Sequence, residues 1–549
     1  VLERARMDQQ EEETLLMVMK MKFWVNVVVL IGIAFATKLV VQLWWRPKKI
    51  TKHFSKQGVK GPPYNLFIGN MKELVDLMLK ASSQPMSLSH HILPRVLPFY
   101  HHWKKIYGAT YLIWFGPTPR LTIADPSLIR EVFSTNAESY EKYEAHPLVR
   151  KLEGNGLISL KGEVWAHRRK TISPIFHLEN LKLMIPIMGK SVGQMVEKWG
   201  KMCNSGKVEL EVSEWFQNLT EEVITRSIFG SSYDVGKHIY HLQAKQIVFA
   251  AESFQKVFFP GYRFVPTKRN RTTWKLDREI EALLLSLIKQ RKERRRRSAD
   301  GKEEEIECHG DLLEALIQAS LNSQGGEEEL EKNKNKSKSW RRITEEDIVE
   351  ECKSFFFAGK HTTSNLLIWT TILLAMHPQW QQLAREEVLR VCGARDIPTR
   401  DHLSNLKTLT MIIYEVLRLY PPIVATIRRT KRDVELGGLN IKQGTELLVP
   451  ILAVHHDPTV WGPDASEFNP TRFSQGMARA AAHSTAFMPF GLGARQCIGQ
   501  NLALLQTKLA IAMILQRFTF DLSPNYKHAP TVLMLLYPQF GAPIIFRSL

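Results

Sequence analysis

The sequence predicts a mostly α-helical protein with small β-sheets, folded as one large domain that follows a single transmembrane helix. Three observations support this fold class. Long segments carry apolar residues at three- and four-residue spacing, alternating segments are few and short, and one continuous apolar run lies near the amino terminus. At roughly 150 residues per domain the 549 residues could hold three domains, but no repeat of solenoid or propeller length occurs after residue 64.

The apolar run covers residues 23–45, and as a helix it would be about 34 Å long, enough to cross the hydrocarbon core of a bilayer. Trp44 and Trp45 close it like an interfacial belt, and no small-residue cleavage site follows. A buried core helix and the apolar part of a signal peptide are the alternatives. We expect a membrane anchor.

The flanks of the run predict its orientation. Basic residues follow it directly, whereas Glu11, Glu12 and Glu13 precede it, so the positive-inside rule places the rest of the chain in the cytosol. The expected division is a short lumenal segment at 1–22, the anchor at 23–45, a basic and proline-rich hinge at 46–63 and a cytosolic domain at 64–549. The chain begins with Val1, and Met7 is a possible start.

Seven segments of the cytosolic part have helical spacing, at residues 180–203, 212–229, 274–296, 345–376, 378–392, 408–419 and 500–518. Short β-rich pieces at residues 110–113, 120–123, 445–450 and 542–546 predict strands. Because the helical segments are longer and more numerous than the strands, one mostly helical domain fits better than three joined domains.

Composition excludes several classes of protein. With 44% apolar and 23% charged residues, the chain is not wholly disordered, collagen-like or a multi-spanning membrane protein. The cysteines are odd in number and form no CxxC pair, which favours reduced thiols in a cytosol-facing compartment over a disulfide framework. They are Cys203, Cys308, Cys352, Cys392 and Cys497.

The net charge of +19 is compatible with nucleic acid, an anionic membrane or an acidic protein as partner. Part of the excess lies in residues 291–305 and 325–342, which mix charge signs and hold few apolar anchors, so we expect them to be solvated loops. No zinc-finger spacing and no basic stripe interleaved with aromatic residues occurs. We therefore expect no nucleic-acid partner.

Residues 490–499 (FGLGARQCIG) carry the most specific chemistry. Gly491 and Gly493 permit tight turns, and Cys497 precedes the apolar helix that begins near Gln500. A thiolate at Cys497 could ligate a metal, with Arg495 and backbone N–H groups balancing its charge. Zinc and iron–sulfur sites need several protein ligands, and none is spaced for that here. A single thiolate suits haem iron, whereas a free buried cysteine is the alternative.

At this point the sequence resembles the cytochrome P-450 superfamily of haem-thiolate monooxygenases, whose signature is F-x-x-G-x-R-x-C-x-G. The fixed positions are matched by Phe490, Gly493, Arg495, Cys497 and Gly499. The resemblance implies haem b (iron protoporphyrin IX) with Cys497 as axial ligand. It also implies O2 and NADPH as cosubstrates, with electrons delivered by an NADPH–cytochrome P-450 reductase. Basic residues on the Cys497 side, including Arg495, could face an acidic reductase.

Other motifs follow in the order that the family requires. Glu415 and Arg418 form E-x-x-R on one helical face, which on its own would be an exposed surface pair. The family joins such a pair to an arginine like Arg472 in a buried network. Trp165 and Arg169 lie four residues apart and could bind a carboxylate together. The resemblance assigns them, with Arg495 and Arg428, to a haem propionate, while Arg168 or Arg429 could point to solvent instead.

Residues 344–376 predict one long helix that Thr344 caps and Pro378 follows. Ala358 and Thr362 lie on one face of it, and in the family the groove at Ala358 and Gly359 accommodates dioxygen. The resemblance then makes Thr362 a hydrogen-bonding and proton-admitting group, whereas a threonine bonded back to the preceding turn is the alternative. His361 replaces the acid usual in the family. It could relay protons or point away and leave that task to water.

The stretches FFFAGKHTTSNLLIWTTILLAMHP and LLVPILAVHHDPTVWG are similar to plant brassinosteroid C-26 hydroxylases. This resemblance implies hydroxylation and inactivation of a steroid hormone such as castasterone or brassinolide, at the endoplasmic reticulum membrane. The expected substrate pocket is apolar, which suits a steroid or terpenoid, although the same residues could be ordinary core. Its walls are Ile423, Val424, Ala425, Thr426 and Leu533.

Three other activities stay open. One is a monooxygenase of the same clan that acts on a gibberellin, a cytokinin or a terpenoid. Another is a haem-thiolate isomerase or dehydratase, and the last is a haem-binding sensor. The intact groove at Ala358 and Gly359, together with Thr362, argues against the isomerase, and no output domain supports the sensor.

Overall fold

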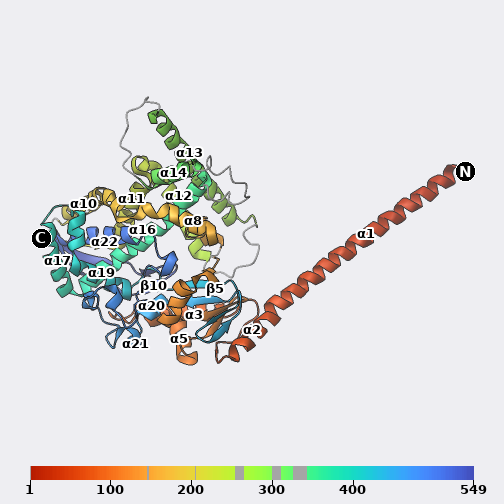
Figure 1. The fold of residues 1–549 in the computed structure, drawn as a ribbon, viewed down its shortest axis with the longest axis horizontal. Helices are drawn as coiled ribbons and strands as arrows, with labels where there is room; N and C mark the ends of the chain where they lie inside the picture. Colours follow the sequence, from red (N-terminus) through yellow and green to blue (C-terminus); the bar gives the residue numbers. More distant parts are fainter. Residues whose placement is uncertain (1, 145–146, 204–205, 254–264, 300–310, 326–342) are drawn as a thin grey trace.

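The computed structural model describes residues 2–144, 147–203, 206–253, 265–299, 311–325 and 343–549. Helices make up most of this part of the chain, and four small sheets lie among them. Figure 1 shows α16 (Glu345–Met376) running through the middle of the body. The largest sheet lies near the point where α2 (Arg46–Ser55) meets the body (Figure 1). The expected fold class, mostly α with small β-sheets, is confirmed.

Seven expected helices are present, three of them with the expected bounds. Those three are α11 (Val212–Phe229), α16 and α17 (Pro378–Cys392). The other four are α10 (Ile185–Met202), α13 (Lys268–Ala299), α19 (Lys407–Leu419) and α22 (Gln500–Leu515). Further long helices are α3 (Met71–Ser82), α5 (Pro98–Tyr107), α8 (Gly162–Ile172), α12 (Tyr233–Ser253) and α14 (Leu312–Gly325).

Shorter helical turns link these elements. They are α4 (Leu93–Val96), α6 (Pro126–Arg130), η2 (Glu131–Thr135), α7 (Pro147–Glu153), α9 (Leu178–Leu181), α18 (Arg400–Asn405), α20 (Ile451–His455), α21 (Pro458–Trp461) and η11 (Gly493–Arg495). Three of them, α6, α7 and α21, begin with proline, whose fixed φ suits the first helical turn.

The largest sheet has the strand order β1-β2-β8-β5-β3. Its members are β1 (Leu112–Phe115), β2 (Thr118–Thr122), β8 (Glu446–Val449), β5 (Thr426–Thr430) and β3 (Tyr140–Lys142), and only the β2–β8 pair is parallel. The sheet β4-β12-β9 joins Lys207–Glu211, Pro543–Ser548 and Phe518–Leu522. Two hairpins pair β6 (Val434–Leu436) with β7 (Leu439–Ile441) and β10 (Pro530–Val532) with β11 (Leu536–Pro538). All four expected strands are present.

The expectation that residues 291–305 form a solvated loop is wrong for residues 291–299. They continue α13, and Arg291 is buried. Its guanidinium lies 3.0 Å from Asp311 and 3.8 Å from Glu314 of the neighbouring α14 segment. Because Arg291 is buried and paired in this way, the arginine-rich segment forms helix rather than a solvated loop. Residues 300–305 and 326–342 of the two tracts, like Cys308, lie outside the described residues.

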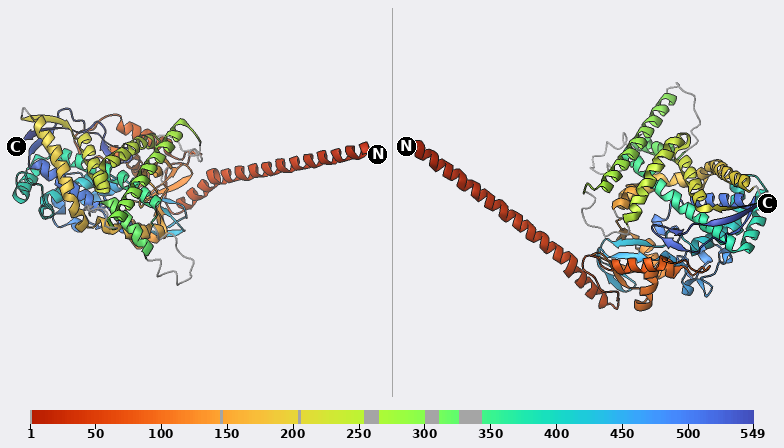
Figure 2. Two further views of the ribbon diagram at one scale, coloured as in Figure 1. Left: turned by 90° about the horizontal axis from the view of Figure 1, so that it is seen from above. Right: turned by 180° about the vertical axis from the view of Figure 1, so that it is seen from behind.

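The amino-terminal part forms one long helical element. It comprises α1 (Leu2–Val40), a π-helical turn η1 (Val41–Trp45) and α2, so helix continues through the first part of the expected hinge. Figure 2 shows from two sides that α1 projects from the body. Residues 16–55 contain an 18-residue window of mean hydropathy 2.2, none of it buried in the protein. By length and composition this helix is a candidate membrane span, and Ile50 and Phe54 of α2 pack on the largest sheet.

Five histidines lie deep in the body, and burial, the largest cause in each case, lowers their pKa values. The pKa falls to about 3 for His90, His455 and His456, and to about 4 for His361 and His528. Two of these rings belong to one hydrogen-bonded chain. His90 bonds to Tyr420 at 3.0 Å, and the Tyr420 hydroxyl lies 3.3 Å from His528. These imidazoles are therefore neutral in the folded protein at neutral pH.

We predict that acid weakens the fold well before its carboxylates titrate. Because the folded pKa values lie below the ordinary 6.5, the unfolded chain binds more protons, and stability is lost as pH falls from about 6.5 toward 4. At pH 5 each such histidine costs about 2 kcal/mol. Urea unfolding between pH 7.5 and 5 measures the slope. His456→Asn should flatten it, the exposed His102→Asn should not, and equal slopes would contradict this account.

Candidate functional site

The loop that ends at Cys497 has the geometry of a rigid ligand holder. The Cys497 N–H donates to the Phe490 carbonyl at 2.8 Å, and the Gln496 N–H donates to the Gly493 carbonyl at 3.0 Å. Gly491 and Gly493 have φ values of +75° and +67°, which L side chains rarely adopt. Gly499 is the N-cap of α22, so Cys497 lies just outside the amino-terminal end of a 16-residue helix.

Gly493 also permits a close approach between two segments. A Cβ built at this position would lie 2.0 Å from the Phe133 carbonyl oxygen of η2. The Cys497 loop therefore rests directly on the η2 backbone, and only a glycine fits there.

The surroundings of the Cys497 thiol fit a ligand in an interior hollow. Its side chain has accessible surface, yet protein surrounds it closely enough for burial to raise its pKa. The Gly499 N–H and then the charge of Arg169 oppose that effect and lower the pKa. The Cys497 thiol is thus accessible although protein surrounds it. Cys203, Cys352 and Cys392 are buried and free, with no such opening.

Three guanidinium groups line up beside this thiol. Arg169 is close enough to act on Cys497, Arg495 is close to Arg169, and Arg428 is close to Arg495. Burial, followed by the neighbouring guanidinium, lowers the pKa to about 10 in both Arg495 and Arg428. Within the described part of the chain, none of the three forms an ion pair with a carboxylate. Their charges call for an anionic ligand.

Aromatic rings and backbone hold these groups in place. Arg495 lies over the Trp165 ring at 4.2 Å and donates to the Leu160 carbonyl at 2.8 Å, while Arg428 lies over Phe133 at 4.3 Å. The expected Trp165, Arg169, Arg428 and Arg495 are thus brought together. Arg495 is half-buried. Arg168 does not point to solvent, because it is buried in ion pairs with Asp347 and Glu351.

These observations fit a haem. The described residues contain no group of three or more His, Cys, Asp or Glu side chains that could hold a bare metal ion, so one accessible thiol has to suffice as protein ligand. A porphyrin supplies the other equatorial ligands, and its two carboxylates match the unpaired guanidinium groups.

The expected Glu415–Arg418–Arg472 network is present and buried. Arg418 makes two hydrogen bonds of 2.7 Å to the Glu415 carboxylate, and both side chains are fully buried. Arg472 lies 3.5 Å from the same carboxylate. Arg418 also donates to three backbone carbonyls, those of His455, Ala465 and Glu467. The network therefore ties α19 to the segment that precedes the Cys497 loop.

His455 extends this network to the Cys497 loop and was missed in the sequence. Its Nδ1 lies 3.1 Å from the Arg418 carbonyl, and its Nε2 accepts from the Met488 N–H at 3.0 Å. Because burial keeps the ring neutral, Nδ1 carries the proton and donates it to that carbonyl. Met488 lies two residues before Phe490. The only sequence signal was the pair of histidines before Asp457, which is not specific.

The middle of α16 carries the other candidate group. The Thr362 hydroxyl donates to the Ala358 carbonyl at 2.6 Å, which is the back-bonded geometry left open above. Both residues are half-buried. A hydroxyl that donates in this way keeps its lone pairs free to accept a further hydrogen bond. Gly359 has a packing reason of its own, because a Cβ there would lie 2.8 Å from Ile224 of α11.

Lys360 and His361 point to different surroundings. Lys360 is buried and lies 3.1 Å from Glu221 of α11 and against the Tyr240 hydroxyl of α12. Burial, and then the charge of Lys360, lower the pKa of His361. The His361 Nε2 atom is buried and has no hydrogen-bond partner in the described residues.

The two expected walls of the substrate pocket lie beside each other. The Leu536 N–H of β11 donates to the Pro422 carbonyl at 2.9 Å, and Trp369 of α16 donates to the Leu536 carbonyl at 3.3 Å. Residues 423–426 and the β10–β11 turn are therefore neighbours on α16. Val424 is buried, Ala425 and Thr426 are half-buried, and Ile423 and Leu533 are 43% and 36% exposed.

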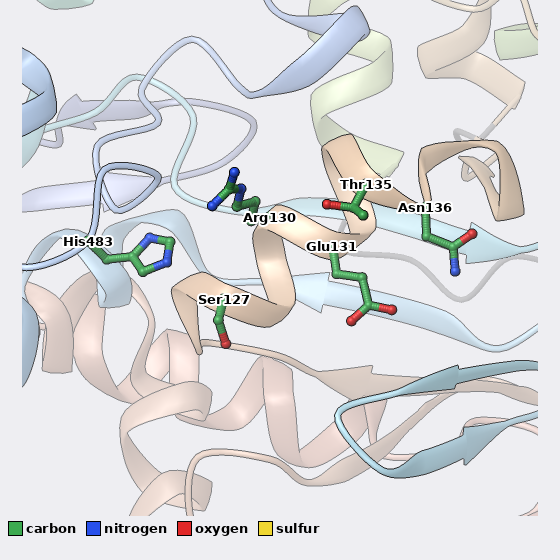
Figure 3. Close-up of a pocket in the computed structure, with 6 residues that line it drawn as sticks. All are labelled: Ser127, Arg130, Glu131, Thr135, Asn136 and His483. Atoms are coloured by element: carbon green, nitrogen blue, oxygen red, sulfur yellow. The ribbon is translucent and has the colours of Figure 1, made fainter.

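One open hollow of about 590 Å³ lies on α6 and η2 (Figure 3). Its lining is polar and consists of Ser127, Arg130, Glu131, Thr135, Asn136 and His483. It contains none of the residues described above. We assign it no role in the site.

Comparisons with known proteins agree with this geometry. A family model described as "Cytochrome P450" matches residues 94–539. The chain is 63% identical to "Cytochrome P450 734A1" of Arabidopsis thaliana over 511 residues, which cover 92% of the chain and 93% of the relative. It is 56% identical to "Cytochrome P450 734A6" of rice, with 93% and 94% covered, and 42% identical to "Cytochrome P450 72A397" of Kalopanax septemlobus, with 94% and 96% covered.

We predict that Gly493→Ala prevents the Cys497 loop from seating on η2. The new Cβ would meet a backbone oxygen that cannot move aside, at a cost of about 3 kcal/mol or more. Gly438→Ala is the matched control, because its φ is +76° with open space around it, so it should cost only about 1 kcal/mol. Thermal unfolding and the amount of haem-bound protein measure both variants. Equal losses would show that the Phe133 contact is unimportant.

Proposed function

Because the chain belongs to the cytochrome P450 family, we propose that it is a membrane-anchored haem-thiolate monooxygenase that hydroxylates a brassinosteroid at C-26 and so inactivates the hormone. The observation that carries the proposal is the accessible Cys497 thiol together with Arg169, Arg495 and Arg428, which follow one another from the thiol. None of the three forms an ion pair with a carboxylate within the described residues. A non-catalytic sensor and an isomerase are the alternatives.

The residues around the hollow divide the work of holding haem b. Cys497 would provide the thiolate ligand, whose charge the Gly499 N–H, Arg169 and the amino-terminal end of α22 would stabilise. Arg169, Arg428, Arg495 and Trp165 provide donors for the carboxylates. When bound, the haem supplies reductive activation of dioxygen and insertion of one oxygen atom into a C–H bond.

Electrons have to come from a partner. The sequence holds no G-x-G-x-x-G fingerprint after a strand, so a flavoprotein reductase that oxidises NADPH is the expected donor. The amino-terminal apolar helix supports a single-pass anchor in the endoplasmic reticulum membrane with a cytosolic catalytic domain. An anchor of this kind also brings the site close to substrates that partition into lipid.

An apolar substrate fits the two wall segments. Val424, Ala425 and Leu533 offer no charge, and Thr426 is the only polar side chain among the five expected wall residues. A steroid skeleton can be bound there by burial of apolar surface, while its few hydroxyl groups need matching donors or acceptors. The 63% identity to a P450 of the 734A group supports a shared substrate class.

Thr362 is the chain's own group for handling protons at the reacting oxygen. Its hydroxyl is oriented by the Ala358 carbonyl, so its free lone pairs have a fixed direction. A fixed acceptor would hold a water molecule in position and so help to deliver protons when the haem and dioxygen are bound.

The function is tested by turnover of the reconstituted enzyme. With reductase and NADPH, castasterone or brassinolide should each yield a product with one additional oxygen atom at C-26, detected by mass spectrometry and NMR. Gibberellins and cytokinins are the comparison substrates, and product from them alone would move the enzyme to another substrate class.

The control for this experiment is Cys497→Ser, which removes the thiolate but preserves the shape of the side chain. It should lose turnover and the thiolate band of the reduced carbon-monoxide complex. Full turnover and an unchanged spectrum in this variant would contradict the whole assignment.

We predict that Thr362→Ala uncouples the enzyme. NADPH consumption should continue while hydroxylated product per NADPH falls about tenfold or more and hydrogen peroxide rises, because the oriented acceptor is lost. Thr371→Ala is the matched control. Its hydroxyl also bonds back along α16, to the Leu367 carbonyl at 3.0 Å, but it is fully buried two turns away. The role fails if the Thr362 variant stays as coupled as the Thr371 variant.

A further inference from the structure

A buried cluster of charges joins α8 to α16 behind the guanidinium groups. Arg168 of α8 is 3% exposed and Glu351 of α16 is completely buried. The Arg168 guanidinium lies 3.1 Å from Glu351 and 2.8 Å from Asp347, one turn earlier on α16. Asp347 is itself fixed, because it closes the capping box with Thr344. One arginine therefore bridges two carboxylates on the first turns of the central helix.

A different side of α8 faces the thiol. Arg169 follows Arg168 by one residue, which turns the side chain by about 100° around the helix. Arg169 acts on Cys497, and Trp165, one turn earlier, lies under Arg495. Since α8 has few apolar residues on a single face, its rotation about its own axis is weakly set by burial. The ion pairs of Arg168 set it instead.

The same carboxylate also holds the segment that precedes α8. The Leu157 N–H donates to Glu351 at 2.9 Å, and a Cβ at Gly156 would lie 2.8 Å from that carboxylate. Three residues further on, the Leu160 carbonyl accepts from Arg495. Through Arg168, Glu351 therefore contacts the helix that carries Arg169. Through the Leu157 N–H it also contacts the loop whose Leu160 carbonyl accepts a hydrogen bond from Arg495.

Burying this cluster is expensive, since each ion loses its hydration and a single lost partner leaves an uncompensated charge. Apolar residues of similar size would give equal or better stability. The free-energy cost of burying these charges is explained if their ion pairs fix the relative positions of the helices. Arg418 gives the comparison, because its buried pair with Glu415 likewise fixes backbone near the Cys497 loop.

We propose that Arg168, held by Asp347 and Glu351, is a positioning residue that sets the rotation of α8 and so aims Arg169 and Trp165 at the carboxylates of the haem. This inference rests on the proposed assignment of the site to a haem. According to the inference, α8 and α16 must keep their relative position for the haem to be retained.

The test compares two arginines in matched surroundings. Arg168→Lys cannot span both carboxylates, because an ammonium lacks the forked geometry of a guanidinium. Arg291→Lys makes the same change at a buried arginine that bridges Asp311 and Glu314 on α14, away from the thiol. Both variants should lose similar stability in thermal unfolding of the full-length holoenzyme.

Only Arg168→Lys should release haem faster, by about tenfold, because the hydrogen bond from Arg169 to a haem carboxylate loses its alignment. Transfer of haem to excess apomyoglobin measures the rate. The reduction potential of Arg168→Lys should shift as well, whereas the Arg291 variant should match the wild type in both measurements. Equal release rates in the two variants would overturn the inference.

A second variant covers the case in which Arg168→Lys does not fold. Glu351→Gln keeps the size of the side chain and an oxygen that can accept from the Leu157 N–H, and Arg168 keeps its ion pair with Asp347, so this variant should fold. It should also release haem faster than the wild type, and unchanged release would count against the inference. A wild-type protein without the thiolate band would instead show that the haem assignment is wrong.

Discussion

Charges buried around one thiol constrain the interior of this protein more than any other feature. A charged group inside a protein needs an opposite charge, either from another residue or from a bound ligand. Arg418 and Arg168 meet this requirement within the chain, through Glu415 and through Asp347 with Glu351. Among the described residues Arg169, Arg428 and Arg495 form no ion pair with a carboxylate. The charge of Arg169 acts on Cys497, Arg495 is close to Arg169, and Arg428 is close to Arg495. These three guanidinium groups therefore mark the place where we expect an anionic ligand to bind.

The two paired clusters act on opposite sides of that place. The Glu415 network reaches the Cys497 loop through His455, whose neutral ring joins the Arg418 carbonyl to the Met488 N–H. The Arg168 cluster reaches the guanidinium groups through α8. Because each cluster connects elements that are distant in sequence, the thiol and the cations are placed by separate supports. Damage to one support leaves the other intact, which makes their contributions separable by experiment.

Much of this could be predicted from local sequence, and the exceptions have a common cause. The bounds of α16 follow from Thr344, from the acidic first turn and from Pro378, all of which act on neighbouring residues. Cys497 and Gly493 are recognisable because their backbone and ligand chemistry need those residue types. The roles of Arg168 and His455 depend on partners far away in the chain. The helix at residues 291–299 depends on Asp311 in the same way, and β4, which is polar, exists because β12 pairs with it. Pairing of distant residues has no local signature.

His361 illustrates how such distant contacts change the chemistry of a recognised motif. Lys360 turns away toward Glu221 and Tyr240, yet its charge remains next to His361 and, together with burial, lowers the pKa of the ring to about 4. A neutral imidazole cannot store a proton at cytosolic pH as a carboxylic acid could. It can only pass one, by accepting at one nitrogen while it donates from the other. Proton supply through this residue therefore requires hydrogen-bonded water on the Nε2 side, which has no protein partner among the described residues. Of the residues proposed to handle protons, His361 is therefore neutral and Thr362 is a hydroxyl held by the Ala358 carbonyl, so neither supplies the charge of an acid.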